Sequence, residues 1–366
     1  MSSSWSELPK DLLWVIFKRL TSISDAARFG AVCSSWKLVE VENRSFCPRP
    51  LPWLMLPALN KLTNTRCFFD FYNKKVLELY LPEMYRKHCC GSSGSWLVLM
   101  DLETEELSLL NPLSRAQFQL PPLIMFPNVK PKKARNYLHI RKVVLSSRPT
   151  LNPDDDYIVM TLAGYGRRLN FCRRGDERWT GIVCPCNSID DVIYYQDKFY
   201  VVSNEGDVVV CDMAYNPPKV AKVALPVTPT CIMQKYLVEG LSGELLLVLK
   251  HMDLVDNEDL SDYCHYTSHF EVFKLEMNSR KWIEVKSLGE QTLFLGENSS
   301  MSLSAPEFPE CRKNCIYFTD DYLEGWLGEC GCFDMGIFSL EDGKIEPYYP
   351  NPPFCHTPTF WVTLNP

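Results

Sequence analysis

The chain has 366 residues, of which 46% are hydrophobic and 23% are charged, as in globular proteins of one large domain or of two or three smaller ones. Its net charge of −7 argues against a nucleic-acid-binding protein, which would carry a basic patch or stripe. No stretch has the apolar length of a membrane span, and residues 1–4 lack the charged and apolar regions that begin a secretory signal. We therefore expect an intracellular protein that binds neither nucleic acid nor a membrane.

We expect this protein in the cytoplasm, the nucleus or both. The one basic cluster, residues 130–135, lies in a Pro-containing stretch. It is either a solvated loop or a nuclear-import signal.

The 16 cysteines are expected to be free thiols. A reducing compartment disfavours disulfides. The close pairs Cys89-Cys90, Cys184-Cys186 and Cys330-Cys332 lack the CxxC spacing of zinc sites, and the chain has only 6 histidines. We therefore predict buried thiols, no structural metal and no cofactor.

Residues 4–45 predict a small module of three short helices. In the first helix, apolar residues recur at helical spacing, namely Leu12, Ile16 and Leu20. Asp25 suits the positive N-terminal end of a second helix, and Trp36 lies in a third. The apolar residues either form only the core of the module or also dock into the groove of a partner.

This segment resembles an F-box. Leu8-Pro9 opens the first helix, Asp25 opens the second, and Val32-Cys33-Ser34-Ser35-Trp36-Lys37 follows at the spacing of the family. F-box modules bind the Skp adaptor of a Skp–cullin–F-box ubiquitin ligase, so the resemblance implies Skp, and through it a cullin–RING scaffold, as partners. The residues that it implies for the Skp contact are Leu8, Pro9, Leu12, Ile16, Leu20, Val32, Cys33 and Trp36. Val32, Cys33 and Trp36 would be shared with the core of the module, and the division between core and contact stays open.

Residues 46–60 are rich in proline, which prevents a helix and favours an extended connector. Trp53, Leu54 and Leu56 are too apolar for a flexible linker. We expect this connector to pack on the body of the protein and to hold the module at a fixed angle.

Residues 61–366 form the body, in which short strands recur without a convincing long helix. They group into five units of about four strands, and such repeats are typical of a β-propeller. A sixth blade would join residues 67–81 to residues 359–364, which closes the ring and removes free sheet edges. We predict a mainly β protein, a three-helix F-box followed by a propeller of six or seven blades. The alternative is a pair of β-sandwiches.

The body is similar to the KIB-type β-propeller domain of a large family of plant F-box proteins. The segments that carry this resemblance are residues 51–57, 91–97, 270–275, 293–296 and 314–321, together with Trp282. These segments are mostly blade core, so they indicate the fold rather than the target.

The sequence shows little sign of catalysis. Residues 154–156 follow Asn152-Pro153 and predict a solvated turn, and Asp320-Asp321 follows a strand and is interpreted as another turn. Residues 252–263 form an acidic insertion, which is either a solvated loop or a contact for a basic patch on a target protein. The target-binding candidates in this insertion are Asp253, Asp256, Glu258 and Asp259.

We therefore predict a non-catalytic substrate adaptor of a ubiquitin ligase, in which the F-box binds Skp and the propeller binds an unknown target. One alternative is an interaction propeller outside any ligase, with an unused F-box. Trp14 or Gly30 would weaken the docking in that case. A second alternative is a propeller enzyme such as a glycosidase, which would need a cluster of acids at the central channel.

Overall fold

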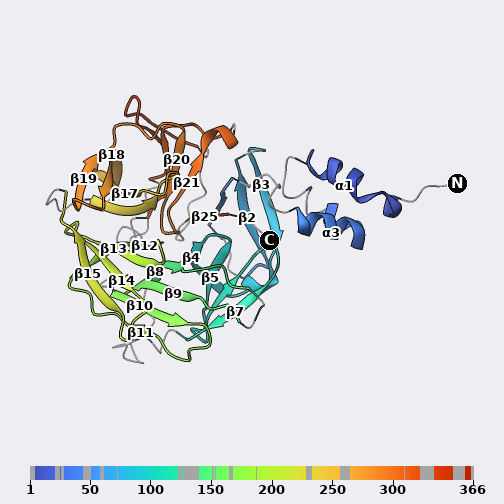
Figure 1. The fold of residues 1–366 in the computed structure, drawn as a ribbon, viewed down its shortest axis with the longest axis horizontal. Helices are drawn as coiled ribbons and strands as arrows, with labels where there is room; N and C mark the ends of the chain where they lie inside the picture. Colours follow the sequence, from blue (N-terminus) through green and yellow to red (C-terminus); the bar gives the residue numbers. More distant parts are fainter. Residues whose placement is uncertain are drawn as a thin grey trace.

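The computed structural model describes residues 5–20, 25, 29–43, 51–57, 62–71, 73–122, 126, 140–150, 152, 154–164, 168–186, 188–227, 233–255, 264–308, 310–321, 334–348 and 359–363. These residues form six sheets arranged in a ring, and the helical module lies outside the ring, next to the N-terminus (Figure 1). The prediction of a mainly β chain with a propeller of six or seven blades is confirmed, and the blades number six.

Blade 1 joins strands from both ends of the body, whereas blades 2 and 3 are each built from four consecutive strands. Blade 1 has the order β25 (Phe360–Val362), β1 (Trp53–Met55), β2 (Thr65–Asp70) and β3 (Lys75–Tyr80). Blade 2 consists of β4 (Lys87–Ser93), β5 (Trp96–Asp101), β6 (Leu107–Leu110) and β7 (Gln117–Leu120). Blade 3 consists of β8 (Ile140–Leu145), β9 (Ile158–Ala163), β10 (Arg168–Arg173) and β11 (Thr180–Gly181).

The other three blades complete the ring. Blade 4 consists of β12 (Ile189–Tyr195), β13 (Lys198–Ser203), β14 (Val208–Asp212) and β15 (Lys219–Ala224). Blade 5 consists of β16 (Met233–Glu239), β17 (Leu245–Val255), β18 (Cys264–Glu276) and β19 (Lys281–Glu284). Blade 6 has the order β21 (Met301–Ser304), β20 (Gln291–Leu295), β22 (Cys315–Phe318), β23 (Gly336–Ser339) and β24 (Ile345–Glu346).

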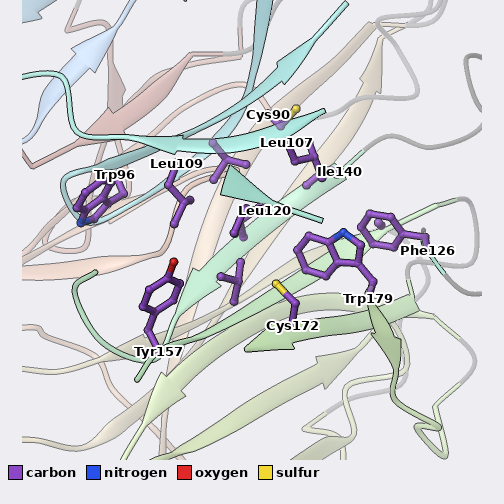
Figure 2. Packing of buried hydrophobic residues seen from close by; sticks show 14 residues of the cluster. Cys90, Trp96, Leu107, Leu109, Leu120, Phe126, Ile140, Tyr157, Cys172 and Trp179 are labelled. Carbon is purple, nitrogen blue, oxygen red and sulfur yellow. The ribbon is translucent and has the colours of Figure 1, made fainter. Parts of the chain in front are cut away.

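Apolar side chains fill the space between each pair of neighbouring blades. Alternation along a strand sends side chains to both faces of each sheet, and each face packs on the next blade. Figure 2 shows the cluster between blades 2 and 3, where the rings of Phe126 and Trp179 stack with their centroids 4.8 Å apart. Six such clusters close the ring, so the body has no single central core.

The closing blade differs in one detail from the prediction. The C-terminal strand β25 does not pair with β2 or β3 but with β1, which in turn pairs with β2. Strand β1 lies within residues 46–60, which we predicted as a connector. The propeller therefore begins by residue 53. Leu54 and Met55 are buried there, and the removal of their apolar side chains from water stabilises this pairing.

Blade 6 contains a strand that we did not predict. Residues 291–295 form β20, which pairs in parallel with β22 and antiparallel with β21. The chain turns back through β21 and the short 3-10 helix Ala305–Glu307, since a parallel pair requires a crossover.

The helical module begins with a 3-10 turn, Trp5–Glu7, and contains α1 (Lys10–Phe17) and α3 (Ser34–Glu42). Between them, Asp25, Phe29 and Gly30 are helical, and the rest of the predicted second helix falls outside the described residues. None of the described helices is long and apolar enough to cross a membrane.

Candidate functional site

The helical module has a small aromatic core. Leu13, Phe17, Phe29, Trp36 and Val39 are buried. The rings of Phe29 and Trp36 lie 4.4 Å apart, and Trp36 Nε1 donates a hydrogen bond of 3.1 Å to the carbonyl oxygen of Trp5. Trp36 therefore belongs to the core, where its loss would unfold the module.

The structure divides the predicted Skp-binding residues into three groups. Trp36 is buried, whereas Leu12 and Val32 are 51% and 53% exposed. Pro9 is also exposed. The remaining four are partly buried against the core, namely Leu8, Ile16, Leu20 and Cys33. The exposed and half-buried members are free to take part in a contact.

The module exposes more apolar surface than the sequence stripe indicated. The side chains in question, which we call the module apolar surface, are Trp5, Leu12, Val15, Val32, Leu38 and Val41. They are six of the nineteen large apolar residues that are exposed in the described chain, although the module is a small part of it. Such an excess of exposed apolar side chains in a small part of a protein is typical of an interaction site. The spacing of Leu12 with Val15 and of Leu38 with Val41, each three residues apart on a helix, was the signal that could have identified the additional residues.

Two further positions in the module bear on docking. Trp14 is half buried and packs on the core, and the Lys18 ammonium lies 4.5 Å from the centre of its ring. Gly30 is buried, and a Cβ atom there would lie 3.1 Å from Glu40 Oε2. Both residues fit the internal packing of the module.

A second candidate site lies where the innermost strands of blades 3 to 6 meet. Strand β8 contacts β12, β12 contacts β16, and β16 contacts β21 around the axis of the ring. Twelve polar residues gather at these strands and the adjoining segments, and we call them the inner polar cluster. They are Arg141, Lys142, Asp190, Asp191, Gln234, Lys235, Tyr236, Lys250, Glu297, Asp320, Asp321 and Asp334.

β-bulges direct several of these side chains. The register of β8 shifts between Ile140 and Lys142, and that of β12 shifts between Ile189 and Asp191. Each bulge inserts one extra residue, and bulges of this kind re-aim side chains. The two bulges place Arg141 and Asp190, with their charged neighbours, at the same end of the ring.

Buried ion pairs hold the cluster together. Lys250 Nζ lies 3.2 Å from Asp321 Oδ1 and 3.0 Å from Asp334 Oδ2. Lys235 Nζ lies 3.1 Å from Asp190 Oδ2, and Lys142 pairs with Asp191. Charges that are this deeply buried need such partners. Asp320 and Asp321, which we interpreted as a turn after a strand, are both buried, and Asp321 contacts residues of another blade.

The pKa values reflect this arrangement. Burial disfavours the charge of Lys250, but the carboxylates of Asp321, Asp334 and Asp320 outweigh it and raise the pKa of Lys250. Burial likewise disfavours the charge of Asp321, but Lys250 and Arg141 hold its pKa below the usual range. Lys250 and Asp321 are therefore both charged at neutral pH.

Glu297 is the exception in this cluster. It is 4% exposed, and its Oε1 has no hydrogen-bond partner. Burial away from water raises the pKa of Glu297 well above its usual range, against the smaller opposing effects of Arg141 and Lys142. Glu297 thus keeps its proton to higher pH than an exposed glutamate would.

The inner polar cluster encloses very little space. The cavity beside Glu297 and Asp321 measures ≈ 10 Å³, which is enough for about one water molecule. A sugar or another substrate of that size does not fit. The ion pairs of the cluster join blades 3 to 6.

The predicted target-binding acids fall partly outside the described residues. Asp253 is exposed in strand β17, where it pairs with Tyr266 of β18. Residues 252–255 therefore extend the strand instead of forming a loop. Asp256, Glu258 and Asp259 lie outside the described residues. The predicted solvated turn at residues 154–156 is confirmed, with Asp154 and Asp156 exposed.

Comparison with known families agrees with this architecture. Residues 68–339 match the family described as KIB1-4 beta-propeller. This chain belongs to the plant F-box proteins with a KIB1-4 β-propeller.

Relatives of this F-box protein cover the helical module as well as the propeller. The F-box protein SKIP23 of Arabidopsis thaliana is 29% identical over 99% of this chain and 96% of its own length. The F-box protein At2g17036 of the same plant is 26% identical over 99% of this chain and 95% of its own. The F-box/kelch-repeat protein KIB1, also from Arabidopsis thaliana, is 26% identical over 87% of this chain and 78% of its own.

Proposed function

We propose that this F-box protein is the substrate-recognition adaptor of a Skp–cullin–F-box ubiquitin ligase. The observation that carries the proposal is the module apolar surface in a chain whose relatives are F-box proteins. The surface would be covered by the Skp adaptor, and the propeller would hold the target protein. Ubiquitin transfer would be accelerated by proximity, without a catalytic residue in this chain.

The structure supports specific roles for the predicted Skp-binding residues. Leu12 and Val32 would be direct anchors, because about half of each side chain is exposed. Pro9 and the half-buried Leu8, Ile16, Leu20 and Cys33 would complete the contact, since part of each side chain is accessible. Trp36 would act from within the core by holding the helices in place.

Asp253, with Asp256, Glu258 and Asp259, remains our proposed contact for a basic patch on the target. This proposal is supported by the exposure of Asp253. It lies in β17, which is longer than the corresponding strands of the other blades. Binding residues are often placed on such extensions of a rigid scaffold.

The experiment that tests the adaptor proposal is a calorimetric titration of the full chain with a purified Skp adaptor. The test variant is Leu12→Ala/Val32→Ala. The matched control is Leu241→Ala/Ile283→Ala, which removes two equally exposed apolar side chains from the propeller. Since anchors of this kind contribute about 2 kcal/mol or more each, the test variant should bind about a thousandfold more weakly.

The control should bind Skp like the wild type. Equal binding by both variants would rule out the module apolar surface as the Skp contact. A wild-type chain that binds no Skp adaptor would favour the second candidate function, an interaction propeller outside a ligase.

An enzymatic role has less support. The acids at the inner ends of the blades form a cluster of the kind that a propeller enzyme would need. However, Asp190, Asp191 and Asp321 are all paired with lysines, and the adjacent cavity has room for about one water molecule.

A further inference from the structure

Two histidines and a glutamate meet on one face of blade 5. His251 of β17 lies directly opposite His269 of β18 in the antiparallel pair. Glu271 is two residues further along β18 and therefore points to the same face of the sheet. A pairing between distant parts of the sequence thus brings three metal-ligating side chains together.

The three side chains are in close contact. His251 Nε2 lies 2.7 Å from Glu271 Oε2. The two imidazole rings are stacked with their centroids 4.0 Å apart and an angle of 12° between their planes. One ligand atom from each of the three residues lies within 4.8 Å of the others. In the described residues this is the one group of His, Cys, Asp and Glu side chains that meets this spacing.

We propose that His251, His269 and Glu271 form a binding site for a divalent transition-metal ion of the Zn²⁺ class. Imidazole nitrogens and carboxylate oxygens bind Zn²⁺ at about 2.0–2.2 Å, and two histidines with one glutamate are a recurring ligand set that leaves a fourth position open. Neighbouring ligand atoms around a tetrahedral ion lie roughly 3.3 Å apart. The ligand atoms in the structure lie within 4.8 Å of one another, so the side chains would rotate about their own bonds to reach this spacing when an ion binds.

The surroundings favour this geometry. Ser268 Oγ donates a hydrogen bond to the carbonyl oxygen of His251 at 3.4 Å and lies 3.2 Å from His269 Nδ1. The Ser268 oxygen can then accept the Nδ1–H of His269, which leaves Nε2 with its lone pair toward a metal. Such a second hydrogen bond is the usual way in which a protein orients a ligating imidazole.

The strands behind the ligands are firmly held. Lys250 precedes His251 and is completely buried on the opposite face, in ion pairs with Asp321 and Asp334. Thr267 donates hydrogen bonds to Asp334 from its backbone N–H, at 2.9 Å, and from its hydroxyl group, at 2.6 Å. A metal site benefits from such support because its ligands lose less freedom on binding.

The site is open to solvent on one side. The side chain of His251 is 19% exposed and that of Glu271 is 39% exposed, so an ion can enter without unfolding the blade. The fourth position would be filled by water or by a group of a bound protein. A bound ion would fasten β17 to β18 next to Asp253, where the two strands continue past the blade.

The test is a zinc titration of the full chain in competition with a chromogenic chelator, followed by Co²⁺ absorption spectroscopy. The variants are His269→Ala and Glu271→Gln, both at solvent-accessible positions of β18. One control is His88→Ala in blade 2. The other is Cys184→Ser/Cys186→Ser, which removes two free thiols that lie close to each other and could bind zinc on their own.

We expect the wild type to bind one equivalent of Zn²⁺ and to show the intense Co²⁺ bands of a tetrahedral site. His269→Ala should weaken zinc binding at least about tenfold, as should Glu271→Gln, and both controls should bind normally. Zinc should also raise the melting temperature of the wild type but not that of His269→Ala.

Zinc binding that is unchanged in His269→Ala, or that disappears in the cysteine control, would overturn the proposal. Absence of wild-type binding at about a hundred micromolar Zn²⁺ would also overturn it and leave a His–Glu hydrogen bond as the role of these residues. The test needs no Skp adaptor, so its outcome does not depend on the proposed ligase function.

Discussion

Leu54 of strand β1 lies directly opposite Trp361 of strand β25, so the two ends of the body meet within a single blade. Trp361 is completely buried, and its Nε1 donates a hydrogen bond of 3.0 Å to the carbonyl oxygen of Leu295 in blade 6. Its own carbonyl oxygen accepts a hydrogen bond of 2.6 Å from Ser92 in blade 2. This one residue therefore connects the closing blade to both of its neighbours.

The first prediction concerns this closure. Trp361→Ala should lower the free energy of unfolding by about 3–5 kcal/mol, because it leaves a large cavity and removes the hydrogen bond from the indole Nε1 to Leu295. Trp361→Phe keeps most of the ring and should cost less. Denaturant unfolding measures both, and Tyr80→Ala, at an exposed residue of the same blade, is the control. A Trp361→Ala protein as stable as this control would contradict the role of Trp361 in closure.

The second prediction concerns the buried lysine of the inner polar cluster. Lys250→Met removes the partner of Asp321 and Asp334 and leaves their charges buried, which should destabilise the protein by about 3–5 kcal/mol. The control is Lys344→Ala, which breaks an exposed pair with Asp342 and should have no clear effect. Chemical denaturation of the two variants is the measurement. If Lys250→Met were as stable as Lys344→Ala, the ion pairs around Lys250 would not contribute to the stability of the folded protein.

The third prediction is a pH dependence that originates from Glu297. Its pKa is raised in the folded protein, chiefly by burial, so its contribution to stability is complete below the unfolded-state pKa of about 4.3. That contribution decreases as the pH rises toward the folded-state pKa, at about 1.4 kcal/mol for each pH unit. Glu297→Gln cannot ionise, so it should become more stable relative to the wild type as the pH rises from about 4 to about 8.

Denaturant unfolding at several pH values tests this prediction. Glu297 is largely buried, so the control is Glu284→Gln, at an exposed glutamate of β19, which should leave the pH profile of stability unchanged. A constant difference between Glu297→Gln and the wild type would show that the carboxyl group does not titrate as inferred.

The fourth prediction separates the core of the module from its contact surface. Trp36→Ala should reduce both helix content and Skp binding, because Trp36 packs on Phe29 in the module core. Leu12→Ala should reduce Skp binding while helix content stays the same, since Leu12 is half exposed. Circular dichroism and calorimetry on the same samples make the comparison. Loss of helix content in Leu12→Ala would place Leu12 in the core instead.

Several of the differences from the sequence predictions have one physical origin. Alternating apolar residues predicted most strands and a propeller of six or seven blades, because the period of a strand is a local property. The pairing of β1 with β25 was not predicted, because Trp53, Leu54 and Met55 follow a proline-rich stretch and give no sign of their distant partner. Asp321 looks like a turn residue for the same reason, and its burial is explained by Lys250 and Tyr236 from another blade.

The sequence by itself determined the order of the parts, the spacing of the F-box motif and the repeated four-strand units. These features depend on residues that are near one another in the chain. The tertiary structure decided which apolar side chains of the module are exposed, so that Leu13 is buried while Leu12 is free. It also decided that His251 faces His269, because the register of two paired strands brings together residues whose spacing in the chain has no meaning of its own.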